Sequence, residues 1–158
     1  MTIRLPLLGL GLAALSLAAA PADDLAKKHQ EQMQGEWVMV SSTNAGMELP
    51  EEVAKKISRV VKGNEFTLTV PGEEGVMTIM AVFKLDPTKT PNEIDVTYKD
   101  GPNKDKTLKA IYELSGDTMK TCYGKPEADR PKKFESSEES GLTVSVWKKA
   151  KKEFKEDK

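Results

Sequence analysis

The side chains that could do chemistry are few and scattered in this chain of 158 residues. It has one histidine, His29, and one cysteine, Cys122. His29 lies on the apolar stripe of a short amphipathic segment, four residues from both Leu25 and Met33, with no second histidine or cysteine nearby. A metal site or a hydrolytic relay needs several such groups together. We therefore expect His29 to have a structural role.

Paired carboxylates are the next candidates, and three sets occur: Glu51-Glu52, Glu73-Glu74, and Asp100 with Asp105. Carboxylates that act as an acid and a base need a set separation, and such pairs are also common on solvated loops. Asn103 adds a third oxygen ligand beside Asp100 and Asp105, but the set falls short of the ligand count of a calcium loop. We predict no enzyme activity, no metal and no cofactor.

Composition indicates one domain with a modest core. Hydrophobic residues make up 38% of the chain, and 24 basic residues nearly cancel 25 acidic ones. With acidic and basic residues nearly equal in number, the chain has no net positive electrostatic field that would attract nucleic acid, so we predict no nucleic-acid partner. A single cysteine cannot form an intramolecular disulfide. Cys122 is expected to be a small buried hydrophobe, with intermolecular pairing or thiol chemistry as the alternative.

Residues 1–22 have the pattern of an export signal. Arg4 precedes an apolar run from Leu5 to Ala19, and small residues follow before Asp23. The run is too short for a comfortable membrane span. We predict cleavage after Ala22, no membrane insertion after signal removal, and a periplasmic or extracellular protein. An uncleaved anchor is the alternative.

The remaining chain is predicted to divide into an N-terminal helix or linker (23–34), a barrel (35–149) and a charged tail (150–158). Alternating apolar residues between turn signals predict eight short strands, and a short helix is expected at 49–57, between the first two. Prolines and a polar run make 124–141 a loop. The predicted strands are 36–42, 58–62, 65–70, 76–85, 93–99, 106–114, 118–123 and 142–147.

Eight strands with mostly short connections favour a mainly β fold, an antiparallel up-and-down barrel. Its connections alternate between the two ends, so the longer loops gather opposite the start of the first strand. We predict the mouth there, with helix 49–57 as a lid or a plug. Such a barrel is either filled by its own side chains or holds one small ligand, and both remain open. The candidate ligand-binding residues are Met39, Val53, Ile57, Phe66, Leu68, Met77, Ile79, Tyr98, Leu108 and Tyr112.

Several motifs in combination resemble a family of uncharacterised secreted domains expanded in planctomycete bacteria. The resemblance covers roughly residues 32–149 and implies a lipocalin-like barrel, since Gly-x-Trp at the head of the first strand is typical of calycin-type barrels. It implies no reaction and no ligand. The motifs are Gln34-Gly35-Glu36-Trp37, Leu49-Pro50-Glu51, Lys62 to Leu68, Phe83 to Lys89 with Pro91 and Ile94-Asp95, Gly101 to Lys104, and Ile111 to Thr118.

The same resemblance implies a structural floor for the barrel. In lipocalins the tryptophan of Gly-x-Trp lies across the closed end, and a basic residue from the last strand packs over its ring. Here Gly35 and Trp37 stand in the motif. Lys148 is the expected basic partner, because it shares a face with Leu142, Val144 and Val146.

Two functions follow as hypotheses. The first is an exported, non-enzymatic lipocalin-like domain that binds a small apolar or amphipathic ligand in the barrel. The alternative is a filled barrel that serves as a structural or protein-interaction module. That module would use its mouth loops or the outer face of strand 76–85, where Val76, Met80 and Val82 lie unless the N-terminal helix covers them.

Overall fold

The computed structural model describes residues 21–73 and 75–151. The predicted export signal, apart from its last two residues, and most of the predicted charged tail lie outside these ranges. Helix α1 (Ala22–Met33) begins one residue before the predicted segment, with Asp23 and Asp24 in its first turn, where carboxylates favour a helix N-terminus. None of the helices among the described residues is long and apolar enough to cross a membrane.

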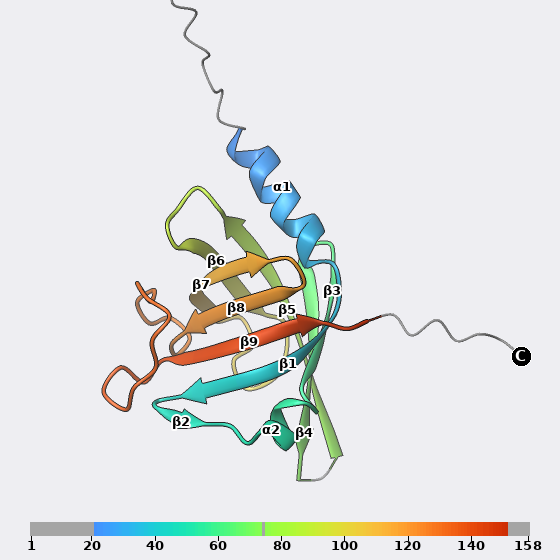
Figure 1. Cartoon of the computed structure of the whole chain (residues 1–158), viewed down its shortest axis with the longest axis vertical. Helices are drawn as coiled ribbons and strands as arrows, with labels where there is room; N and C mark the ends of the chain where they lie inside the picture. The colour runs from blue at the N-terminus through green and yellow to red at the C-terminus, as the bar shows by residue number, and fades with distance from the viewer. Residues whose placement is uncertain (1–20, 74, 152–158) are drawn as a thin grey trace, which may run out of the picture.

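Eight strands form the predicted up-and-down barrel (Figure 1). Each pairs antiparallel with the next in the chain, and the last pairs with the first to close the barrel. The predicted mainly β fold is therefore confirmed. The strands are β1 (Gly35–Asn44), β3 (Ser58–Lys62), β4 (Glu65–Gly72), β5 (Gly75–Asp86), β6 (Asn92–Tyr98), β7 (Thr107–Ser115), β8 (Thr118–Tyr123) and β9 (Thr143–Lys149).

The connection between β1 and β3 differs from the prediction in two ways. The chain turns at Ala45-Gly46 and returns as a short strand, β2 (Met47–Glu48), which pairs with the end of β1. Helix α2 (Glu51–Ala54) then spans four residues, which is less than the predicted helix 49–57. Its buried side chain is Ala54, so the segment packs against the barrel through a small residue.

The tight turn between β3 and β4 fixes which side chains enter the core. Gly63 has φ +60°, a left-handed conformation that suits glycine, and the hairpin pairs Lys62 with Glu65. Residues opposite each other in an antiparallel pair point to the same face. Arg59 therefore lies beside Leu68, and Val61 beside Phe66.

A β-bulge in β1 shapes the open end. Met39 pairs with Trp147 of β9, whereas Ser41 pairs with Val146, so β1 holds one extra residue at this point. The extra residue shifts the alternation of faces. As a result Ser42 faces inward and is buried, and its hydroxyl lies 2.9 Å from that of Ser145.

Helix α1 closes the opposite end of the barrel (Figure 1). Trp37 is fully buried there, and its indole Nε1 donates a hydrogen bond of 2.7 Å to the carbonyl oxygen of Met33. The Gln34 side chain bonds both backbone groups of Gly63, at 2.7 and 2.9 Å, which ties the helix end to the β3–β4 turn. Gly35 has φ +103°, a backbone conformation that L side chains rarely adopt.

The basic partner of Trp37 is Lys149, and the prediction of Lys148 is wrong. Lys149 Nζ lies 5.3 Å from the centre of the Trp37 ring and donates to the Gln32 carbonyl oxygen at 2.9 Å. Lys148 is exposed. The error is one of strand face. The prediction placed Val144 and Val146 inward, whereas the buried positions of β9 are Thr143, Ser145 and Trp147.

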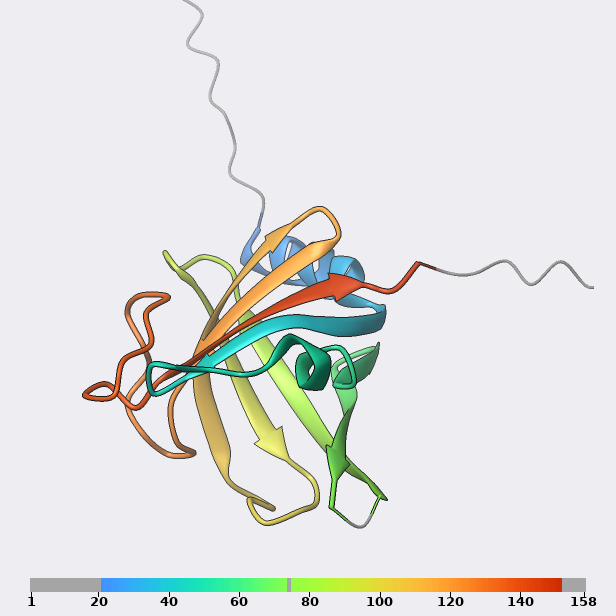
Figure 2. The same ribbon diagram turned by 60° about the horizontal axis from the view of Figure 1, so that its bottom comes forward.

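The long loop of residues 124–142 covers part of the outside of the barrel. Figure 2 shows it projecting on the same side as the β1–β2 turn, and the Gly46 amide donates to the Ser136 hydroxyl at 3.0 Å. Beneath the loop, Ile111 and Cys122 lie opposite each other on β7 and β8, and are 1% and 0% exposed. Cys122 is thus the buried hydrophobe that the sequence predicts, but on the outer face of the sheet.

Candidate functional site

Two adjoining cavities occupy the barrel interior and its open end. The inner cavity has a volume of about 70 Å³ and the mouth cavity about 370 Å³. Leu68, Tyr123 and Trp147 line both, so the two meet at these side chains. Other residues of the inner cavity are Arg59, Phe66, Ile94, Val96, Tyr98, Leu108, Ala110 and Thr121, and the mouth cavity adds Met39, Ser42, Asn44, Met47, Glu48, Leu49, Ile57, Val70 and Thr143.

Arg59 is the charged side chain of the inner cavity. It is 9% exposed, and its guanidinium carbon lies 4.2 Å from the centre of the Trp147 ring and 5.7 Å from that of Phe66. One terminal nitrogen, Nη2, lies 3.1 Å from the sulfur of Met119. Both the Nε of Arg59 and the indole Nε1 of Trp147 are buried without a hydrogen-bond partner among the described residues.

No carboxylate in the part of the chain that the structure describes neutralises the charge of Arg59. Among residues 21–73 and 75–151, no acidic side chain forms an ion pair with it. Burial lowers the pKa of Arg59 to about 9, so the guanidinium still carries its charge at neutral pH. Tyr123 interacts electrostatically with Arg59, and burial raises the pKa of Tyr123, so its hydroxyl is neutral at this pH.

Six of the ten predicted ligand-binding residues line these cavities. Met39 and Ile57 belong to the mouth cavity, and Leu68 lines both. The inner cavity takes the other three: Phe66, Tyr98 and Leu108. Five of the six came from the alternation of apolar residues along strands, which correctly assigned their faces, and Ile57 came from the predicted helix 49–57.

The other four predicted residues lie elsewhere. Val53 is 37% exposed, because the neighbouring Ala54 takes the buried position of α2. Met77 is 46% exposed near the tip of the β4–β5 hairpin, and Ile79 on the same strand is half-buried beside Gly101. Tyr112 is buried at the closed end, where its hydroxyl lies 2.8 Å from Nδ1 of His29 on helix α1.

Arg59, Trp147 and Tyr123 are the site residues that sequence reasoning missed. A signal for Arg59 was present in the β3–β4 hairpin. A two-residue turn at Gly63-Asn64 pairs Arg59 with Leu68, and Leu68 was assigned to the interior. Residues paired in this way share a face, so Arg59 has to point inward as well.

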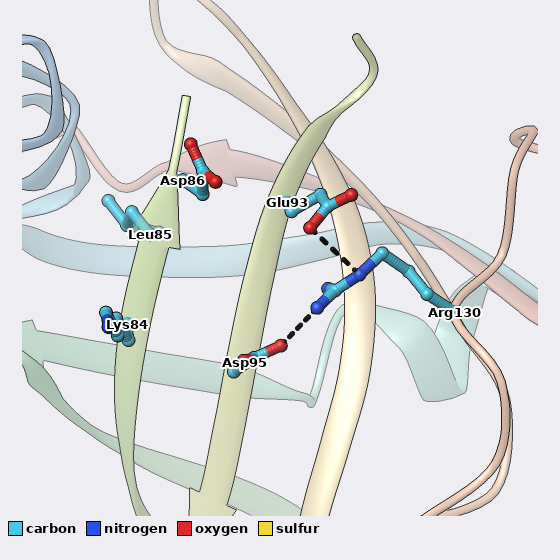
Figure 3. Close-up of a pocket in the computed structure, with 6 residues that line it drawn as sticks. All are labelled: Lys84, Leu85, Asp86, Glu93, Asp95 and Arg130. Carbon is cyan, nitrogen blue, oxygen red and sulfur yellow. Dashed lines mark hydrogen bonds and ion pairs between the residues drawn. The ribbon is translucent and has the colours of Figure 1, made fainter. Parts of the chain in front are cut away.

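A second, polar cleft lies on the outer surface, and its chemistry is structural. It has a volume of about 140 Å³ between β5, β6 and the long loop. Figure 3 shows Arg130 reaching from that loop to Glu93 and Asp95 of β6. The same guanidinium donates to the carbonyl oxygens of Ile94, at 3.1 Å, and Ala110, at 2.6 Å. With these four acceptors engaged, Arg130 clamps the loop onto the barrel.

The histidine, the cysteine and the paired carboxylates that the sequence offers do not gather into a metal site in the described part of the chain. Among the described residues no group of three or more His, Cys, Asp or Glu side chains is placed to hold a metal ion. Comparison of the chain with models of known protein families, with curated proteins and with solved structures finds no match. The function of this protein is therefore inferred from the barrel and its cavities.

Proposed function

We propose that this protein binds a small amphipathic molecule at the open end of its barrel, as an exported domain without enzyme activity. The observation that carries the proposal is the mouth cavity. Its volume of about 370 Å³ falls in the range of roughly 300–1,000 Å³ that is usual for small-molecule sites. Apolar side chains supply most of its wall, Ser42, Asn44 and Thr143 add polar groups, and Glu48 adds a carboxylate.

The depth of the barrel limits where a ligand sits. The inner cavity, about 70 Å³, has room for a small polar group but not for a long alkyl chain, because side chains from all eight barrel strands fill the rest of the core. The apolar body of a ligand therefore belongs in the mouth cavity.

A neutral lipophilic fluorophore, N-phenyl-1-naphthylamine, tests the proposal. We expect saturable binding to the chain beginning at Asp23, with quenching of tryptophan fluorescence because Trp147 lines both cavities. Val70→Trp narrows the mouth and is expected to weaken binding at least tenfold. Val60→Trp is the matched control, because Val60 is exposed and lines neither cavity. Absence of saturable binding, or equal binding by both variants, would contradict the proposal.

Export is the second part of the proposal. It is supported by Arg4, the apolar run that follows it and the small residues before Asp23. N-terminal sequencing of the protein from the envelope and the medium of its host is expected to give a chain that begins at Asp23. A chain that keeps Leu5 to Ala19 would contradict cleavage.

A filled barrel that acts as a protein-interaction module is the second candidate. It is favoured by the outer face of β5, where Val76 is 70% and Met80 50% exposed, so helix α1 leaves them uncovered. In this case Val76→Ser with Met80→Ser and Val82→Ser removes a partner from pull-downs of envelope extract. Fluorophore binding with unchanged pull-downs would exclude this alternative.

A further inference from the structure

The barrel buries a positive charge, and no residue within 21–73 or 75–151 supplies a partner of opposite charge. Arg59 lies between the rings of Trp147 and Phe66, and its third close neighbour is the sulfur of Met119. The faces of aromatic rings attract a cation, but they do not accept hydrogen bonds as a carboxylate does. Taking an unpaired charge out of water is costly, so proteins pair nearly all such groups.

Two side chains that line the same small cavity each carry an unpaired donor among the described residues. Arg59 Nε and Trp147 Nε1 are both buried without an acceptor among the described residues, and both side chains line the inner cavity. Because both groups are donors and the guanidinium is charged, the acceptor that suits them best is one that carries negative charge. The hydroxyls of Thr121 and Tyr123, which line the same cavity, are neutral and add no such charge.

The shapes of the two cavities match a molecule with a small head and an apolar body. The inner cavity, at about 70 Å³, has room for a carboxylate group. The mouth cavity, at about 370 Å³, continues from it past Leu68, Tyr123 and Trp147 to the open end. A planar guanidinium is the side chain best suited to bind a carboxylate through two parallel hydrogen bonds.

We propose that the ligand is a monocarboxylic acid with an apolar tail, whose carboxylate binds Arg59 and the Trp147 indole N–H in the inner cavity while its tail fills the mouth cavity. This inference rests on the proposed function of the barrel. It makes Arg59 the residue that selects acids over neutral molecules of the same length.

Displacement of the neutral fluorophore by competing ligands measures the contribution of the carboxylate separately from that of the alkyl tail. Octanoate and 1-octanol have tails of equal length, and at pH 7.5 we expect octanoate to bind wild-type protein at least tenfold more tightly. Arg59→Met keeps a long apolar side chain and is expected to abolish that preference while 1-octanol still binds. Lys62→Met is the matched control: it removes one positive charge from the exposed side of the same strand and is expected to keep the preference.

The outcomes distinguish the inference from the proposed function. Equal binding of octanoate and 1-octanol to wild-type protein, or an acid preference that survives in Arg59→Met, overturns the role of Arg59 and leaves the barrel a ligand-binding site. Failure of both compounds and of the fluorophore overturns the proposed function itself.

A measurement on wild-type protein keeps the test valid if Arg59→Met does not fold. Octanoate labelled with carbon-13 at its carboxyl group is titrated in the bound state. Beside a buried guanidinium its pKa is expected to lie below that of free octanoate. A bound carboxyl pKa equal to or above the free value overturns the inference.

Discussion

In the proposed binding site, Arg59 is the residue at which binding is expected to come at a cost in stability. Its guanidinium loses its hydration in the barrel, and contacts with the rings of Trp147 and Phe66 offset part of that cost, by about 2 kcal/mol for a desolvated cation. Sites prepared for a ligand are commonly destabilising when they are empty. Arg59 is expected to behave in this way.

Arg59→Met is therefore expected to stabilise the ligand-free protein by about 1 kcal/mol or more, because a well-packed apolar side chain replaces an unpaired buried charge. The free energy of unfolding in urea measures the effect. Lys62→Met, at an exposed position, is expected to stay within about 0.5 kcal/mol of wild type. A loss of stability in Arg59→Met would show that the arginine serves mainly to hold the core.

Two adjacent lysines of β9 provide a second test at the residue scale. Lys149→Met removes a cation from the Trp37 ring and a hydrogen bond to Gln32, and is expected to cost about 0.5–2 kcal/mol. Lys148→Met changes an exposed side chain and is expected to change stability little. Urea unfolding of both variants compares them, and equal effects would contradict the assignment of Lys149 to the floor.

At the scale of elements, the loop of residues 124–142 works as a cover held by a clamp. Arg130 binds Glu93 and Asp95 of β6, and Lys120 of β8 lies 5.2 Å from the centre of the Phe134 ring in the loop. Cys122 lies under this cover, 3.8 Å from the Glu135 carbonyl oxygen. Access to its thiol therefore reports whether the loop is in place.

Arg130→Met is expected to speed the reaction of Cys122 with a disulfide reagent about tenfold or more at pH 8. Burial raises the pKa of the Cys122 thiol, so a detached loop increases both access and the thiolate fraction. Lys133→Met is the control, since Lys133 and its ion-pair partner Glu135 are both largely exposed in the same loop. An unchanged rate in Arg130→Met would mean that other contacts hold the cover.

The elements also show what a sequence can and cannot predict. Alternation and tight turns correctly placed all eight barrel strands, because each local pattern matches its final environment. Strand β2 was missed because two residues carry no periodicity. The bulge beyond Met39 was missed because only the pairing with β9 reveals it. The face of β9 was wrong in the prediction of Lys148, because Val144 and Val146 also form an apolar stripe, whereas Trp147 lies on the buried face.

The site was harder to predict than the fold. Apolar alternation found Phe66 and Leu68, yet it passed over Arg59, since a charged residue ordinarily faces solvent. Met77 was assigned inward by its strand face, but that face leaves the core toward the hairpin tip. Burial depends on how far each strand extends past its neighbours, which a single strand does not show.

At the scale of the whole molecule, the two ends of the barrel have separate tasks. The closed end is held by helix α1, whose His29 bonds the Tyr112 hydroxyl, and the open end holds both cavities. Burial lowers the pKa of His29, and the charge of Lys28 lowers it further. The unfolded chain, with a histidine pKa of about 6.5, then takes up a proton more readily than the folded one.

His29 is therefore expected to contribute stability that is complete above about pH 6.5 and declines as the pH falls below that value. The stability lost between pH 8 and pH 5.5 is expected to be smaller in His29→Gln than in wild type, as measured by urea unfolding at both values. The carboxylates change the free energy of unfolding with pH equally in both proteins, so their contribution cancels in the comparison. An equal loss in both would contradict the effect.

The chain enters the barrel from helix α1 and leaves it after β9 at the same, closed end. There the Ala150 amide donates to the Glu36 carbonyl oxygen at 2.8 Å. The mouth cavity opens at the opposite end. A protein attached to a surface or to another domain through either terminus would thus hold its opening toward the surrounding solution. A tag or tether at either terminus of the barrel therefore leaves the route to the cavity clear.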